Sequence, residues 1–74
     1  MTDYIVRVTY KPSFNFRESR ARFSNLSRMA GEHNALKRVG MGDEATIKFG
    51  DDKDRSRFIE AAKKLDYIDS IMSE

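Results

Sequence analysis

The chain has 74 residues and no cysteine, with 39% hydrophobic and 35% charged residues and a mean hydropathy of −0.69. A chain this short can build one small core, and the lack of cysteine excludes disulfides and thiolate metal sites. No stretch approaches the ~18 apolar residues of a membrane-spanning helix, and the first residues lack the basic and apolar regions of a signal peptide. We therefore expect one small cytoplasmic domain over residues 1–74.

The net charge of +2 hides an uneven distribution along the chain. Residues 1–42 contain eight basic and three acidic side chains, whereas residues 43–74 contain six basic and nine acidic ones. Such an imbalance is typical of proteins with an anionic partner. In a compact domain, basic and acidic elements also neutralise one another, so both interpretations stay open.

Residues 3–10 predict the first strand. Their β-branched and aromatic side chains alternate, and the more apolar face consists of Tyr4, Val6, Val8 and Tyr10. Pro12 ends this strand because proline has no amide hydrogen for a sheet.

Residues 16–30 predict the first helix. Asn15 stands three residues before Glu18, which is the spacing of an N-cap with a reciprocal partner, and Gly31 can end the helix in a left-handed conformation. One face of this helix is predicted to be buried and holds Phe16, Ser19, Phe23, Leu26 and Ala30. The opposite face is predicted to be exposed and holds Arg17, Arg20, Ser24 and Arg28, with Arg22 toward the flank.

A hairpin is predicted over residues 35–49, with its turn at residues 40–43. The first strand of the hairpin is either short or bulged, because Leu36 and Val39 fall on opposite faces. The returning strand alternates regularly, with Ala45, Ile47 and Phe49 on one side.

A second helix is predicted over residues 53–65, and a weaker final strand over residues 67–72. The helix has acidic residues at its start and Lys63 and Lys64 in its predicted last turn, which suits the helix dipole at both ends.

The resulting order is β-α-β-β-α-β, which predicts an α+β ferredoxin-like sandwich. Two helices would cover one face of a four-stranded antiparallel sheet, with the first and third strands in its centre. The weaker second and fourth strands would then be edges, and an edge strand could pair two copies of the chain into a homodimer.

The segment over residues 44–49, with the acidic turn and amphipathic helix after it, resembles the third strand and second helix of RNA-recognition-motif domains. Those domains stack bases on aromatic side chains of the two central strands. The matching third-strand positions here hold Glu44 and Thr46, and the first strand offers Ile5 or Arg7. The base-stacking function is therefore not transferred, although a register shifted by one residue would turn the tyrosines outward and restore it.

No group of residues predicts an enzyme, a metal site or a cofactor. His33 is the single histidine and has only its sequence neighbour Glu32 as a partner. Asp51, Asp52 and Asp54 could hold a cation through oxygens, but their place at a helix start predicts capping instead.

The candidate binding surface consists of cations on the first helix and on the sheet: Arg7, Arg17, Arg20, Arg28, Lys37, Arg38 and Lys48. Arginine suits bidentate contacts to carboxylate or phosphate. The first hypothesis is a non-enzymatic adaptor or inhibitor that docks an acidic protein surface, of the size common among phage and mobile-element accessory proteins. Phe14, Met29 and Met41 are its candidate apolar anchors. The alternative is a nucleic-acid-binding module with sequence-independent phosphate contacts.

Overall fold

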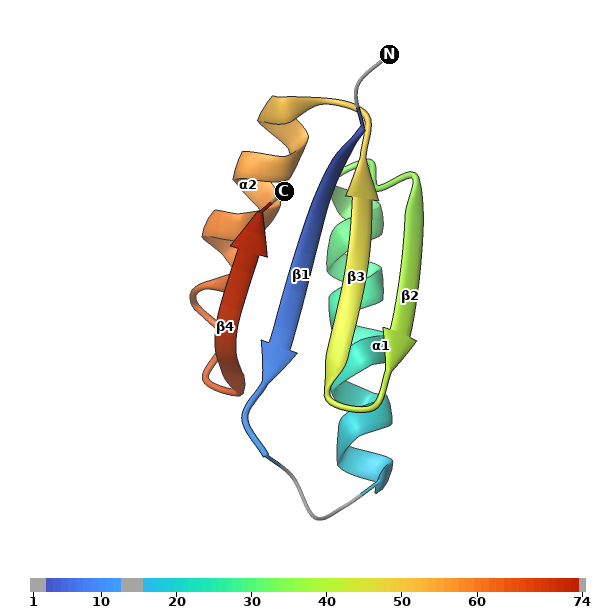
Figure 1. Ribbon diagram of the computed structural model, residues 1–74, viewed down its shortest axis with the longest axis vertical. Helices are drawn as coiled ribbons and strands as arrows, with labels where there is room; N and C mark the ends of the chain where they lie inside the picture. The colour runs from blue at the N-terminus through green and yellow to red at the C-terminus, as the bar shows by residue number, and fades with distance from the viewer. Residues whose placement is uncertain (1–2, 13–15, 74) are drawn as a thin grey trace.

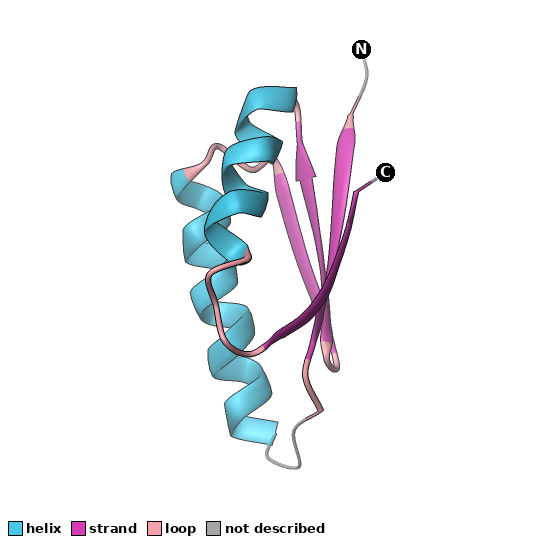
Figure 2. Ribbon diagram, turned by 90° about the vertical axis from the view of Figure 1, so that its left-hand side faces the viewer, coloured by secondary structure: helices cyan, strands magenta, loops and turns pink. Residues whose placement is uncertain are grey.

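One antiparallel sheet has the strand order β2-β3-β1-β4, and both helices cover the same face of it (Figures 1 and 2). This computed structural model describes residues 3–12 and 16–73. The elements are β1 (Tyr4–Tyr10), α1 (Phe16–Glu32), β2 (Lys37–Met41), β3 (Glu44–Phe49), α2 (Asp52–Ala62) and β4 (Ile68–Ser73). The predicted ferredoxin-like α+β sandwich is confirmed, including the central position of the first and third strands.

The alternation predicted for the two central strands is also confirmed. β1 and β3 pair with Tyr4 opposite Phe49 and Val8 opposite Ala45. The helix-facing side of these strands is buried and comprises Val6, Val8, Tyr10, Ala45, Ile47 and Phe49. The other side, which we call the open sheet face, has no helix over it (Figure 2).

The core lies between this buried side of the sheet and the two helices. Leu26 and Ala30 reach it from α1, and Phe58 and Ala62 reach it from α2. The rings of Phe49 and Phe58 are 5.3 Å apart between centroids. Burying a side chain of this size contributes ~1.5–3 kcal/mol, so a few aromatic and aliphatic groups account for much of the stability of so small a core. Neither described helix is both long and apolar enough to cross a membrane.

α1 ends later than predicted, and the predicted role of Gly31 is wrong. Gly31 is helical, and Asn34 instead takes the left-handed conformation with φ 65°. The Ala35 amide donates to the Ala30 carbonyl (2.9 Å) and the Asn34 amide to the Gly31 carbonyl (3.2 Å), which is the Schellman pattern. Asparagine is one of the few residues other than glycine that adopt this conformation readily. The predicted N-cap, Asn15, lies outside the described residues.

The hairpin turn is shorter than predicted. β2 continues through Gly40 to Met41, so that only Gly42 and Asp43 form the turn. Gly42 has φ 60°, and a glycine at the first position of a two-residue turn fits type II′. At the other end of β2, the Leu36 amide donates to the carbonyl of Lys48 (2.7 Å), which is also the register partner of Lys37. Within β2 itself, the register against β3 is regular from Lys37 to Met41.

α2 begins as the acidic cluster predicts, but it ends earlier. Asp51 is the N-cap, and its carboxylate accepts a hydrogen bond from the Lys53 amide (2.9 Å). The helix ends at Ala62, so the prediction that Lys63 and Lys64 form its last turn is wrong. The Lys64 amide donates to the carbonyl of Ala61, three residues earlier in the chain. This turn is tighter than an α-helical turn and leads the chain out of the helix.

Tyr10 carries a buried hydroxyl. Its side chain is 2% exposed, and no described residue offers the hydroxyl a hydrogen-bond partner. Burial, with a smaller contribution from the charge of Tyr67, raises the pKa of Tyr10 from 10.0 to about 12. The cause is that a phenolate loses its hydration inside the core.

The Tyr10→Phe variant is therefore expected to lose less stability than the wild type when the pH rises above 10. The unfolded tyrosine ionises near pH 10, whereas the folded one keeps its proton up to about pH 12. The wild type should lose up to ~1.4 kcal/mol per pH unit in this window relative to the variant. Urea unfolding at pH 8, 10 and 11 measures the difference. A difference that stays constant with pH would show that the hydroxyl titrates normally.

Candidate functional site

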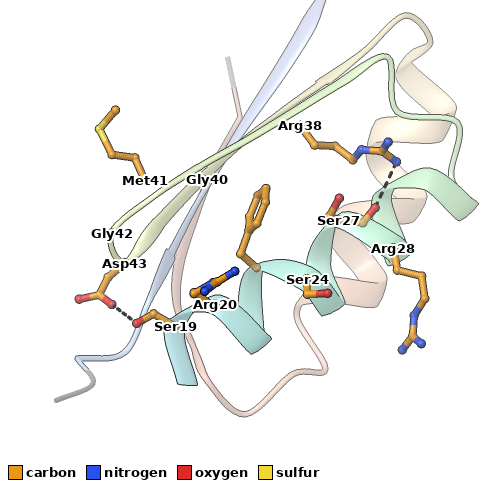
Figure 3. A pocket seen from close by; sticks show the side chains of 11 residues that line it. Ser19, Arg20, Ser24, Ser27, Arg28, Arg38, Gly40, Met41, Gly42 and Asp43 are labelled. Atoms are coloured by element: carbon orange, nitrogen blue, oxygen red, sulfur yellow. Dashed lines mark hydrogen bonds between the residues drawn. The ribbon is translucent and has the colours of Figure 1, made fainter. Parts of the chain in front are cut away.

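A groove of about 990 Å³ runs between α1 and the edge strand β2, and we call it the α1–β2 groove (Figure 3). Its polar and charged lining comes from α1 on one side and from β2 with its turn on the other: Ser19, Arg20, Ser24, Ser27, Arg28, Arg38 and Asp43. The remaining lining residues are Phe23, Gly40, Met41 and Gly42. The groove thus combines three arginines with an aromatic ring.

The ring of Phe23 lies directly against the backbone of Gly40. A methyl group at Gly40 would come within 2.6 Å of the Phe23 Cδ1 atom, which is closer than real contacts allow. Phe23 itself is half-buried and packs against the core at its inner side. Glycine at this strand position therefore lets an aromatic side chain form part of the groove lining.

Arg38 spans from the sheet to the helix across one end of the groove. Its Nη1 atom donates to the Ser27 carbonyl (3.3 Å), a contact drawn in Figure 3. The same atom lies 2.6 Å from where a methyl group at Gly31 would stand, so the small residue leaves room for the guanidinium. At the other end of the groove, the Ser19 hydroxyl donates to the Asp43 carboxylate (3.0 Å). Asp43 is the single carboxylate in the lining, against three guanidinium groups.

The structure divides the seven predicted cations between two sides of the molecule. Arg20, Arg28 and Arg38 line the groove, whereas Arg17 is exposed on α1 outside it. The other three, Arg7, Lys37 and Lys48, occupy the open sheet face. Lys37 and Arg38 are adjacent in sequence but lie on opposite sides of the sheet because side chains alternate along a strand.

The open sheet face mixes cations with apolar side chains. Lys37, Lys48 and Ile5 form one row across β2, β3 and β1. Val39, Thr46, Arg7 and Met72 form the next row, across all four strands. The Lys48 ammonium is 3.0 Å from the Asp3 carboxylate. Tyr4 and Tyr10 share the helix-facing side with Phe49, as predicted, so the described positions of the open face hold no aromatic ring.

The predicted apolar anchors have different surroundings. Met41 is 79% exposed, with its side chain on the open-sheet-face side of β2, whereas Met29 is half-buried and packs against the core. Phe14 lies outside the described residues. Phe23 was predicted to be buried, and its partial exposure in the groove was not anticipated. The signal was Gly40, since a glycine inside a strand often marks a close approach by another group.

A second, smaller cleft of about 410 Å³ lies on the other flank of α1. Its polar groups bond to each other: Asn25 Nδ2 donates to the Tyr67 hydroxyl (3.0 Å), and Arg22 donates to Glu18 (2.7 Å). Arg22 also lies 5.3 Å from the centre of the Tyr67 ring. These contacts fix the loop before β4 against α1, which is a structural role.

The acidic cluster and His33 are likewise occupied with structural contacts. Asp51 caps α2, Asp52 pairs with Arg55, and Asp54 accepts a hydrogen bond from Asn34 (3.4 Å). Within the described part of the chain, no three histidine or carboxylate groups gather as a metal site would require. The ring of His33 meets the ring of Phe58 edge-on at 6.5 Å.

Comparisons with known proteins support the fold of this chain but assign it to no family. No family model matches the sequence, and no curated protein matches it. Among solved structures, the structured domain of Boca from Drosophila melanogaster is similar, with a TM-score of 0.81 and 12% sequence identity. The match covers 99% of this chain and 96% of that domain. At this identity the likeness shows that the two chains share their fold.

Proposed function

We propose that this protein is a non-enzymatic, cytoplasmic protein-binding module, an adaptor or inhibitor, that docks an acidic partner in the α1–β2 groove. The observation that supports this proposal is the combination of three arginines, Arg20, Arg28 and Arg38, with the half-buried ring of Phe23 in one groove.

This combination suits a protein partner for two physical reasons. Arginine forms bidentate contacts to carboxylates and loses little hydration, so it is enriched among the residues that dominate protein interfaces. An aromatic ring beside the charges supplies apolar area that a partner's side chain can cover. Nucleic acid, in contrast, would gain from cations on one continuous track with stacking rings, and the open sheet face offers cations without rings.

The proposal is tested by capture from a lysate of the source cells, with and without nuclease, on immobilised protein. The groove variant carries Arg20→Glu and Arg28→Glu. Its matched control carries Arg17→Glu and Arg57→Glu, which changes the net charge equally at exposed positions on the helices outside the groove.

Proteins specific to the wild type should persist after nuclease treatment, bind the control nearly as well, and bind the groove variant at least tenfold more weakly, or ~1.4 kcal/mol. If nuclease removes the captured material, the protein instead binds nucleic acid. Equal losses for both variants would mean that overall charge, and not the groove, determines binding.

A further inference from the structure

β2 is an edge strand, and its outer side is accessible. Among the described strands it pairs with β3 alone, and all five of its residues are exposed. Edge strands carry backbone amide and carbonyl groups that another strand can pair with. The groove described above lies directly beside this edge (Figure 3).

The hairpin determines which backbone groups point outward. In a two-residue hairpin, the residues that flank the turn form a hydrogen-bonded pair, and such pairs recur at every second residue. Met41 and Glu44 flank the turn, so Met41 and Val39 direct their backbone groups toward β3. Arg38 and Gly40 then direct theirs toward the free edge.

The two sides of an added strand would meet different surroundings. Residues directly opposite each other on neighbouring strands point to the same side of a sheet. Partner side chains opposite Arg38 and Gly40 would therefore enter the groove and meet Arg38 together with the α1 arginines. Partner side chains opposite Val39 and Met41 would lie on the open sheet face, beside groups that are 43% and 79% exposed.

We propose that the partner binds as an extended segment that adds to the free edge of β2, with acidic side chains facing the groove and apolar side chains alternating with them on the open sheet face. This inference rests on the proposed function and specifies its binding mode. Main-chain hydrogen bonds would supply affinity, and the alternating contacts would supply specificity.

The positive charges on β2 favour an acidic segment over a second copy of the chain as the strand that pairs with this edge. Two copies paired through β2 would bring two Lys37 and Arg38 pairs to one edge, next to the arginines of both α1 helices. Lysine and arginine on an edge strand oppose such self-pairing, because like charges approach each other. The same cations attract a strand with carboxylates at alternate positions.

The test uses the full chain and a capped nine-residue peptide in which Glu and Val alternate. A control peptide has the same composition, with the Glu residues in one block and the Val residues in another. Amide exchange of the labelled protein is measured by NMR with each peptide. With the alternating peptide, exchange of the Arg38 and Gly40 amides should slow at least tenfold, and the block peptide should bind at least tenfold more weakly. Unchanged exchange at both amides would overturn the inference.

A pair of variants isolates the backbone contact. Arg38→Ala removes the guanidinium but keeps the outward amide, whereas Arg38→Pro removes both. The proline variant should bind the alternating peptide at least tenfold more weakly than the alanine variant, with circular dichroism confirming that both fold; if the proline variant does not fold, the exchange measurement decides. Equal binding by the two variants would also overturn the inference. The outcome of the capture experiment is independent of this test, because captured proteins can depend on Arg20 and Arg28 without adding a strand to β2.

Discussion

Phe58→Ala is expected to destabilise the protein by ~3–5 kcal/mol, the cost of removing a fully buried phenylalanine and leaving a cavity. Phe58 is completely buried and packs against Phe49 from the sheet and His33 from the end of α1. It therefore joins three elements at one point. A domain of this size has a total stability of only ~4–11 kcal/mol, so the variant loses a large fraction of it.

Urea unfolding followed by circular dichroism measures this loss. The exposed neighbour Arg57 provides the control, because Arg57→Ala removes a large side chain from the same helix turn and should change stability by less than ~0.5 kcal/mol. A loss below ~1.5 kcal/mol for Phe58→Ala would mean that the ring does not hold α2 on the sheet.

Gly40→Ala is expected to destabilise the protein by ~1–3 kcal/mol, although the change adds only one methyl group to an exposed edge strand. The new Cβ atom would lie 2.6 to 2.8 Å from three atoms of the Phe23 ring, so the ring must move. Restricting the unfolded chain acts in the opposite direction by only ~0.4–1 kcal/mol. A displaced ring would also enter the α1–β2 groove and weaken binding there.

A double-mutant cycle assigns this effect to the ring. In a Phe23→Ala background, Gly40→Ala should cost less than ~0.5 kcal/mol, because the clash has been removed. Gly50→Ala is the matched control, since its methyl group would meet only the exposed side chain of Leu36, at 3.1 Å. If Gly40→Ala costs the same with and without Phe23, the destabilisation arises from the strand itself.

Alternation made the centre of the sheet predictable from the sequence. β1 and β3 each pack one face on the helices, so apolar and polar residues alternate along Val6, Arg7 and Val8 and again along Ala45, Thr46 and Ile47. Helix periodicity likewise placed Leu26, Ala30 and Phe58 in the core. These patterns arise wherever one side of a helix or strand faces solvent and the other side is buried in the core.

The edge strand and the helix ends were less predictable for a physical reason. β2 is exposed along its whole length, so burial imposes no pattern on it, and its last two residues resembled a turn. The end of α1 depends on hydrogen bonds around Asn34, and glycine at position 31 is instead small enough to let Arg38 approach. Local composition does not distinguish these two uses of a glycine.

The candidate site combines residues whose nearness depends on tertiary structure. Arg20 and Arg38 line one groove because α1 lies beside β2, and Lys37 is absent from it because a strand turns alternate residues to opposite sides. The sequence identifies these residues as candidate binding cations. Only the register of the sheet shows which of them line the α1–β2 groove and which lie on the open sheet face.

The position of β1 in the sheet has a consequence for the order of folding. β1 comes first among the strands in the chain, yet it lies between β3 and β4, and Val6 is opposite Ser73 at nearly the other end of the sequence. Only the β2–β3 hairpin joins strands that are neighbours in sequence. We expect this hairpin and α1 to form early. The pairing of β1 with β4 closes the longest loop in the chain, and the pairing of β1 with β3 in the middle of the sheet also waits for a long loop to close, an entropic barrier that slows folding. Until then, the inner edge of β3 stays unpaired and open to other chains.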